Sequence, residues 1–242
     1  MQSAARSTGE TAAVKHPILR LEEISDELYR ASDLRIEQVS DKRLWLFDLE
    51  ATGLDTTRER ITQIAGIPLQ GGELIEDEAF VEFVSIPDDV EIPKVVEDLT
   101  GITREHLLGA PSFANAWRAC VDAAGSADVW IGQSVFEFDV PILETEMARH
   151  GMPVELPPTL DSVVMATHLL GPPEGRWSTS ALIDRFAVDV SGLRRHDALD
   201  DVRILGRILK PMLELVRAEH GDALVIPAES PVDIKRHAPV RS

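Results

Sequence analysis

The chain has 242 residues, of which 44% are hydrophobic, and it contains a single cysteine. This length and composition suit one large domain or a medium domain with extensions, and they exclude a chain that is disordered throughout. One thiol excludes an internal disulfide and a cysteine-built zinc site, so we expect a reducing, cytoplasmic location. The sequence has no apolar run of the roughly 20 residues that a membrane helix needs, and no signal-peptide pattern in its first twenty residues, so we expect no membrane association.

The formal charge is −18, with 42 acidic against 24 basic residues. Taken alone, this charge counts against nucleic-acid binding, because phosphates repel an acidic surface. Acidic residues that bind divalent cations would also add to this total, and a small basic face can lie on an acidic body. Nucleic-acid binding therefore stays open, beside the simpler alternative that the charge only serves solubility.

The chain begins with two segments that precede the main domain. Residues 1–17 are rich in Ala, Ser, Thr and Gly without an apolar period, which predicts a disordered tail. Residues 18–40 form an extension in which apolar side chains recur from Ile18 to Val39, and we predict one or two short amphipathic helices there. An apolar stripe needs cover, so residues 18–39 should dock on the main domain, on a second copy in a homodimer, or on another protein partner.

The main domain is predicted over residues 41–218 and opens with three strands. The short apolar run 44–47 is typical of a strand buried on both faces, and 61–67 and 79–84 suit two further strands of a meander. Gly71-Gly72 is a candidate hairpin turn between them. A connector with one short helix follows over residues 87–108.

The rest of the domain alternates helices with one more strand. The strand is a short apolar segment at 128–131, and the helical spacings lie at 112–124, 141–150, 161–169, 178–186 and 197–215. Strands first, then helices and a strand in alternation, indicate an α/β fold with a mixed sheet covered by helices. Residues 219–242 carry Pro, Ala and scattered charge, which predicts a loose C-terminal tail.

The first chemical signal lies at the end of the first buried strand, in Asp48-Leu49-Glu50-Ala51-Thr52-Gly53. Residues i and i+2 of a strand share a face, so Asp48 and Glu50 should point the same way. Two carboxylates this close repel each other unless a cation lies between them, and oxygen ligands favour hard ions such as Mg²⁺ or Mn²⁺. For this motif alone, the alternative is a solvated strand end with two charges.

Two further signals come later in the chain. Asp139 follows a strand and a turn and precedes an apolar helix, where a helix cap is the alternative role. His196 lies on a loop five residues before Asp201, in the early turns of the next helix. The unperturbed pKa of histidine lies near neutral pH, so a histidine beside a metal centre is suited to act as a general base. The alternative is a solvated histidine on a loop.

The order and contexts of these three signals together resemble the DEDDh exonucleases of the ribonuclease H-like fold, the family of bacterial polymerase proofreading subunits, ribonuclease T and oligoribonuclease. The family motif Asp-x-Glu-x-Thr-Gly is similar to residues 48–53, and Asp139, His196 and Asp201 match its second and third motifs. The likeness spans about residues 44–213. One departure is Gln133-Ser134, where relatives often carry His-Asn.

The resemblance implies a ribonuclease H-like fold and a 3′–5′ exonuclease that hydrolyses terminal phosphodiesters of DNA or RNA to nucleoside 5′-monophosphates. Its partner would be a nucleic-acid 3′ end, and its cofactors two divalent cations, Mg²⁺ or Mn²⁺. His196 would act as general base. Leu54 and Phe138 would touch the terminal base and sugar, and the backbone of Thr52 and Gly53 would bond the 3′-hydroxyl. The metal ligands would be Asp48, Glu50, Asp139 and Asp201.

Several roles have a structural alternative. Leu54 and Phe138 could be ordinary core residues, and Arg176-Trp177 could either contact nucleic acid or cap a helix. A basic stretch around the third motif, comprising Arg194, Arg195, Arg203, Arg207 and Lys210, could attract phosphates or be a solvated helix face. For the whole chain, the alternatives are a non-cleaving nucleic-acid or partner-binding protein of the same fold, and a hydrolase of small phosphodiesters.

Overall fold

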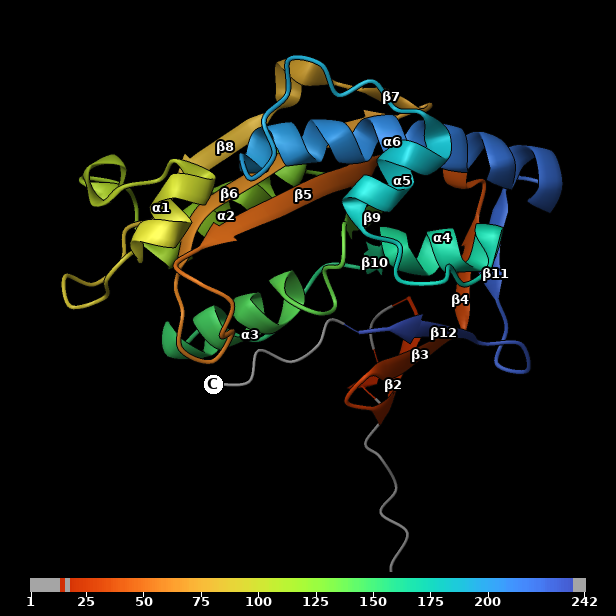
Figure 1. Cartoon of the computed structure of the whole chain (residues 1–242), viewed down its shortest axis with the longest axis horizontal. Helices are drawn as coiled ribbons and strands as arrows, with labels where there is room; N and C mark the ends of the chain where they lie inside the picture. Colours follow the sequence, from red (N-terminus) through yellow and green to blue (C-terminus); the bar gives the residue numbers. More distant parts are fainter. Residues whose placement is uncertain (1–13, 16–17, 237–242) are drawn as a thin grey trace, which may run out of the picture.

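The computed structural model describes residues 14–15 and 18–236, and its centre is a mixed sheet (Figure 1). Strand β5 (Leu44–Ala51) pairs antiparallel with β6 (Ile61–Gln70) and parallel with β9 (Val129–Gly132). The order across the sheet is β10-β9-β5-β6-β7, and β8 also pairs with β6. The remaining strands of this sheet are β7 (Glu73–Leu74), β8 (Phe80–Phe83) and β10 (Thr159–Asp161).

The strands of the predicted meander are confirmed, with one addition. Gly71 and Gly72 have φ values of 60° and 81° and join β6 to the short strand β7, before the chain returns as β8. Both values lie in the left-handed region, which glycine adopts without the steric cost that a side chain would bring. The turn therefore forms at the two glycines where the sequence predicts it.

Helices cover both faces of the sheet, as predicted. Alternate residues of β5 enter two separate cores: Leu44 and Leu46 pack with α4 and α6, whereas Trp45 and Phe47 pack with α2 and α3. The α-helices of the described chain are α1 (Lys94–Thr100), α2 (Phe113–Ala124), α3 (Asp139–Arg149), α4 (Ser162–Leu170), α5 (Thr179–Phe186) and α6 (Ala198–His220), with 3-10 turns η1 (Val39–Asp41), η2 (Glu76–Glu78) and η3 (Arg104–Leu107).

The prediction of helices over residues 18–40 is wrong, because this segment forms strands. Its apolar residues alternate with a period of two: Leu34 and Ile36 are buried, and Arg35 between them is exposed. Asp33, with φ 57°, interrupts the extended chain between β3 and β4. The strands are β2 (Arg20–Ser25), β3 (Leu28–Ser32) and β4 (Leu34–Glu37).

The prediction of a loose tail over residues 219–242 is also wrong for its described part. Strand β11 (Ala223–Ile226) pairs with β4, and β12 (Val232–Lys235) pairs with β3. The two ends of the chain therefore complete each other's backbone hydrogen bonds (Figure 1). The predicted N-terminal tail, residues 1–17, lies outside the described residues except β1 (Val14–Lys15), which pairs with β2.

The apolar stripe of residues 18–39 is largely buried within this chain, although Ile24 is 39% exposed. Leu19, Tyr29, Leu34 and Val39 belong to the same core as α4 and α6. The main domain thus covers the surface for which a homodimer or a protein partner was a candidate. Within the described residues, the helices are all too short or too polar to span a lipid bilayer.

Candidate active site

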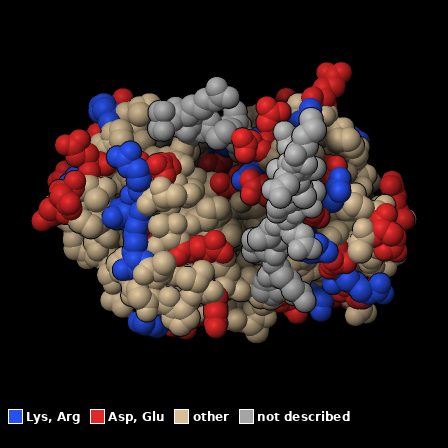
Figure 2. All heavy atoms as spheres, turned by 90° about the horizontal axis from the view of Figure 1, so that it is seen from below, with Lys and Arg blue, Asp and Glu red and all other residues tan. Residues whose placement is uncertain are grey.

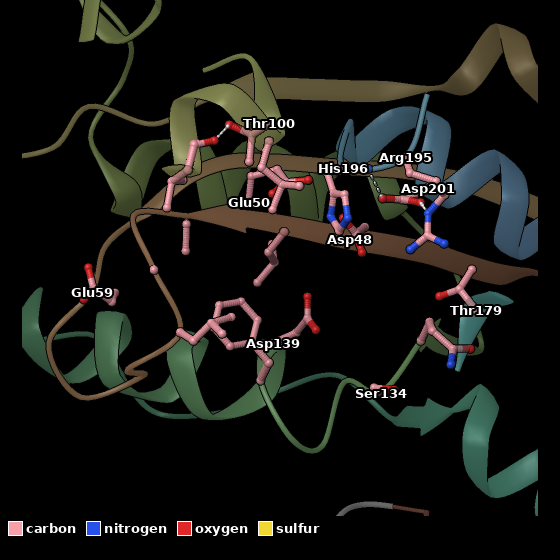
Figure 3. A pocket seen from close by; sticks show the side chains of 18 of the residues that line it. Asp48, Glu50, Glu59, Thr100, Ser134, Asp139, Thr179, Arg195, His196 and Asp201 are labelled. Atoms are coloured by element: carbon pink, nitrogen blue, oxygen red, sulfur yellow. Dashed lines mark hydrogen bonds and ion pairs between the residues drawn. The ribbon is translucent and has the colours of Figure 1, made fainter. Parts of the chain in front are cut away.

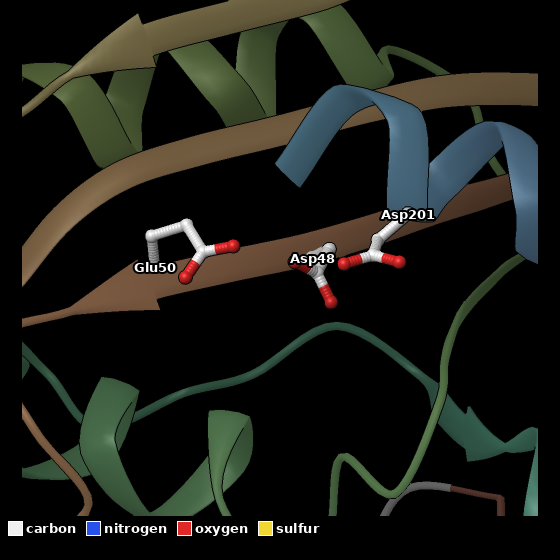
Figure 4. A group of neighbouring side chains, drawn as sticks. All are labelled: Asp48, Glu50 and Asp201. Atoms are coloured by element: carbon white, nitrogen blue, oxygen red, sulfur yellow. The ribbon is translucent and has the colours of Figure 1, made fainter. Parts of the chain in front are cut away.

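Strand β5 carries the first two acidic residues of the site. Asp48 and Glu50 follow Leu44 and Leu46 on the face that α6 covers, so they continue a buried row. Glu50 is only 9% exposed and Asp48 is half-buried. The predicted common orientation of the two carboxylates holds (Figure 4).

Helix α6 brings a third acid to the same place. The Asp197 side chain caps this helix by accepting a hydrogen bond from the Asp200 backbone N–H at 3.1 Å, which places Asp201 in the first turn. Oxygen atoms of Asp48, Glu50 and Asp201 lie within 4.8 Å of one another (Figure 4). Asp201 also accepts hydrogen bonds from Arg195 Nε at 2.5 Å and the His196 backbone N–H at 2.7 Å.

Asp139 lies across the cavity from this cluster, as the first residue of α3 (Figure 3). It is 5% exposed, and its Oδ1 atom has no hydrogen-bond partner among the described residues. The residue at the helix cap position is Phe138, so capping does not explain this acid. The turn before it is held by buried Asp161, whose carboxylate accepts hydrogen bonds from the backbone N–H groups of Ser134 and Phe136.

Burial and neighbouring carboxylates destabilise the charged forms of Asp48, Glu50 and Asp139. Burial, then the carboxylates of Asp139 and Glu50, hold the pKa of Asp48 well above its ordinary value. Burial likewise raises the pKa of Asp139, and burial followed by the Asp201 charge raises that of Glu50 to about 7. Such a site needs protons or cations for balance, and its all-oxygen donor set with one orphaned buried oxygen fits a hard divalent ion.

His196 enters the cavity from the loop before α6. Its side chain lines the same cavity as that of Asp48 (Figure 3). Its backbone has φ 62°, a conformation that non-glycine residues rarely adopt, and the hydrogen bond from its N–H to Asp201 holds it there. The loop thus couples the position of the histidine to that of the third acid.

The cavity has a volume of about 710 Å³ and joins all five of these residues. Leu54 and Phe138 both line it. Leu54 is 68% exposed and is therefore not a core residue, whereas Phe138 is partly buried and also packs against the core around α2 and α3. Thr52 is fully buried, and its hydroxyl donates to Glu59 Oε2 at 2.5 Å and accepts from the Arg60 N–H. Gly53 also lines the cavity, with Glu59 so close that a side chain at position 53 would force it to shift.

Sequence reasoning missed other lining residues. Val95 and Leu99 of α1 are exposed by 73% and 49% and face the cavity, and an exposed apolar pair on a short helix is the signal that could have identified them. Glu59, Ser178 and Thr179 also line it, and no pattern in the sequence distinguishes them.

Arg176 and Trp177 have structural partners. Arg176 pairs with Glu137 at 3.2 Å, and the Trp177 indole N–H donates to the Gly171 carbonyl, which favours the capping alternative. The basic stretch is largely neutralised: Arg203 binds Glu76 and Asp200, and Lys210 binds Glu73. It therefore offers less attraction for phosphates than its charge suggests.

Solved structures of nucleases share this fold. The nuclease domain of 3′hExo, a DEDDh family member bound to rAMP, matches with a TM-score of 0.63 at 17% identity, over 74% of this chain and 94% of that one. Cell-death related nuclease 4 matches with a TM-score of 0.62 at 18% identity, covering 74% and 66%. E. coli exonuclease I with a dA16 oligonucleotide has a TM-score of 0.58 at 19% identity, covering 74% and 42%. The predicted ribonuclease H-like α/β fold is confirmed.

Among curated proteins, the chain is similar to DNA polymerase III PolC-type of Streptococcus pyogenes serotype M1, with 29% identity over 176 residues. The match covers 73% of this chain and 11% of that protein, so the chain spans about a tenth of the relative's length.

A family model described as exonuclease, that of the ribonuclease T family, matches residues 45–209. This range contains β5, α3 and the first turns of α6, the three elements that carry the acids. The chain is an enzyme of the ribonuclease T exonuclease family.

Proposed function

We propose that this protein is a metal-dependent 3′–5′ exonuclease that hydrolyses terminal phosphodiesters of nucleic acid and releases nucleoside 5′-monophosphates. The observation that carries the proposal is the convergence of Asp48, Glu50 and Asp201 within 4.8 Å, in one cavity with Asp139 and His196. A protein of this fold that only bound nucleic acid would have no need for four crowded carboxylates, because they repel its ligand.

The four acids would hold two divalent cations, Mg²⁺ or Mn²⁺. Asp48, Glu50 and Asp201, whose oxygen atoms lie within 4.8 Å of one another, would hold the ions together with Asp139 across the cavity. When bound, the ions would stabilise the negative charge that develops on the phosphate and on the leaving oxygen. The orphaned Oδ1 of Asp139 and the oxygen-only donor set support this assignment.

The protein's own groups would supply the rest. A ring nitrogen of His196 accepts a proton from the attacking water, and the water oxygen bonds to phosphorus as the bond between phosphorus and the 3′-oxygen breaks. The released 3′-oxygen takes up a proton and leaves with the shortened strand. Leu54 and Phe138 contact the terminal base and sugar, and the backbone of Thr52 and Gly53 bonds the terminal 3′-hydroxyl. The exposure of Leu54 at the cavity edge supports the first of these roles.

The similar proteins support a nucleic-acid substrate. One is named as bound to rAMP, another as complexed with a dA16 oligonucleotide, and exonuclease X, with a TM-score of 0.55 and 19% identity, as complexed with 5′ overhanging duplex DNA. They point to DNA and RNA alike, so both belong in the test.

The test is release of mononucleotides from end-labelled DNA and RNA oligomers with Mg²⁺ or Mn²⁺. We expect Asp48→Ala to abolish release while the melting temperature holds or rises, because one buried charge has been removed from a repelling group. Asp77→Ala, which removes an exposed acid on η2, is the matched control and should keep full activity. Near wild-type turnover by Asp48→Ala would overturn the proposal.

A further inference from the structure

The cavity has two chemically different ends, with the acids between them (Figure 3). Figure 3 places Glu59 and Thr100 at one end, and helix α1, which ends at Thr100, also brings the exposed apolar side chains of Val95 and Leu99 to the cavity lining. Exposed Leu54, on the loop between β5 and Glu59, lines the cavity as well, and this end is apolar. The other end is polar and is formed by the loop that precedes α3 and by the start of α5. Its residues are Gln133, Ser134, Ser178, Thr179 and Ser180.

The acids in the middle fix where the reacting phosphate must lie, so the terminal nucleoside and the rest of the strand lie at opposite ends. The apolar end suits the terminal nucleoside, because its exposed side chains offer a surface for one base and this nucleoside has no further phosphate. Glu59 lines that end, and an additional phosphate would be repelled there. The polar end is left for the strand.

The polar end offers donors for an anion. Helix α5 begins at Thr179, and the backbone N–H groups of a first helical turn have no acceptor within the helix and carry a partial positive charge. The Ser178 hydroxyl accepts from the Ala181 N–H at 3.2 Å, so its own hydrogen stays available. Figure 3 shows Arg195, the sole Arg or Lys among the residues that line the cavity, above Thr179.

The two walls of the polar end are held together before any ligand binds. Gln133 Nε2 donates to the Trp177 carbonyl at 2.8 Å, and its Oε1 accepts from the Ser162 hydroxyl at 2.5 Å. The pair of Arg176 with Glu137 joins the same two segments. These hydrogen bonds and this ion pair fix the positions of the two segments and of the donor groups on them. Binding of a ligand therefore does not have to order these segments.

We propose that the polar end is the subsite for the leaving strand, in which the hydroxyls of Ser134, Thr179 and Ser180 and the first turn of α5 hold the phosphodiester next to the scissile one. This inference rests on the proposed exonuclease function. The contacts are to phosphate alone, so the subsite accepts any base. In the reaction, water oxygen bonds to phosphorus, the bond to the 3′-oxygen breaks, and that oxygen takes a proton and leaves with the strand held here.

Two probes separate this subsite from the rest of the cavity. The p-nitrophenyl ester of a nucleoside 5′-monophosphate carries a terminal nucleoside and a reacting phosphate but no strand. A 5′-phosphorylated dinucleotide adds one nucleoside and the phosphate that the polar end would hold. The measured quantity is the ratio of kcat/KM for the dinucleotide to kcat/KM for the ester, in Mn²⁺.

We expect Thr179→Val and Ser180→Ala each to lower this ratio, by roughly tenfold or more, which is the usual effect of losing one hydrogen bond to a charged group. Thr179→Ser restores the hydroxyl and should restore the ratio. Thr145→Val, which removes a hydroxyl bonded to the Pro141 carbonyl inside α3, is the control and leaves the ratio unchanged. Hydrolysis of the ester by each variant shows that it is folded.

An unchanged ratio in Thr179→Val and Ser180→Ala, whether both rates fall together or neither falls, overturns the subsite. If the wild-type protein hydrolyses neither probe, the exonuclease function itself fails and the subsite fails with it. Activity of the wild type with an unchanged ratio in the variants overturns the subsite alone.

Discussion

The cavity differs in the groups that it buries from the two small sheets at the ends of the described chain, β1-β2-β3-β12 and β11-β4, which we call the chain-end sheets. In the cavity, Glu50 and Asp139 are buried as acids that repel each other, and one oxygen of Asp139 has no partner. In the chain-end sheets, β3 pairs with β12 and β4 pairs with β11, so their backbone groups are hydrogen-bonded. Leu34 and Ile36 of β4 are buried among apolar neighbours. The first arrangement costs folding free energy and the second stabilises the fold.

The difference indicates a division of roles. Residues that carry the chemistry lie where the sheet, α3 and α6 hold them despite repulsion, and the stability that allows this comes partly from segments far from the chemistry. Changes in the cavity should therefore alter activity without lowering stability. Changes in the chain-end sheets should lower stability and leave the activity per folded molecule unchanged.

The largest effect is expected at His196. His196→Ala should lower turnover by about 10² to 10⁴-fold with little change in nucleic-acid affinity, because a general base is lost and no metal ligand is removed. His196→Asn is the sharper variant, since asparagine tolerates the left-handed backbone at φ 62° but cannot act as a base. Single-turnover rates on one labelled oligomer measure the effect. Wild-type rates in both variants would show that the histidine is only a loop residue.

A smaller effect, on the stability of the whole fold, is expected from changes in the chain-end sheets. Leu34→Ala should lower the free energy of unfolding by about 2 to 5 kcal/mol, because Leu34 is 1% exposed and its loss leaves a cavity. Arg35→Ala, one residue on, removes an exposed side chain whose pair with Glu37 lies at the surface, and should change stability by less than about 1 kcal/mol. Denaturant unfolding measures both, and equal stabilities of the two variants would contradict the comparison. Residual activity per folded molecule should be unchanged.

The smallest effect is a pH-dependent one in the cavity. Burial raises the pKa of Glu50 from 4.5 to about 7, so the folded protein without metal holds a proton that the unfolded chain has lost. Its contribution to stability is complete below pH 4.5 and is lost as the pH rises through 7. In EDTA, wild type and Glu50→Gln should therefore have similar stability at low pH, and wild type should be less stable at pH 8, by about 3 kcal/mol at most.

Divalent ions should remove this difference in stability between the wild type and Glu50→Gln. Millimolar Mg²⁺ or Mn²⁺ should raise the wild-type melting temperature at pH 8 more than at pH 5.5, since protons compete with the ions for the carboxylates. Asp48→Ala should lose the effect, and Asp77→Ala should keep it. A wild-type melting curve that is indifferent to both ions and to EDTA at pH 8 would count against a preformed metal site.

Much of the catalytic domain was predictable from local patterns. Period-two alternation identified the face that Asp48 and Glu50 share, and capping by Asp197 identified the helix turn that carries Asp201. The predicted helices and strands of residues 44–215 occur within a few residues of their expected bounds. These features depend on contacts between residues close in the chain, which a single sequence records directly.

The remainder depends on residues far apart in the chain. Arg203 looks like a free cation until Glu76 is placed beside it. Strands β3 and β4 pair with β12 and β11, which lie near the opposite end of the described chain. The two ends of the cavity likewise arise because α1, α3 and α5 meet around β5. Only the tertiary structure decided these strand pairings, ion pairs and cavity walls. Every strand offers the same backbone N–H and C=O groups, and every arginine offers the same guanidinium group. Which partner each of them finds therefore depends on how the whole chain packs.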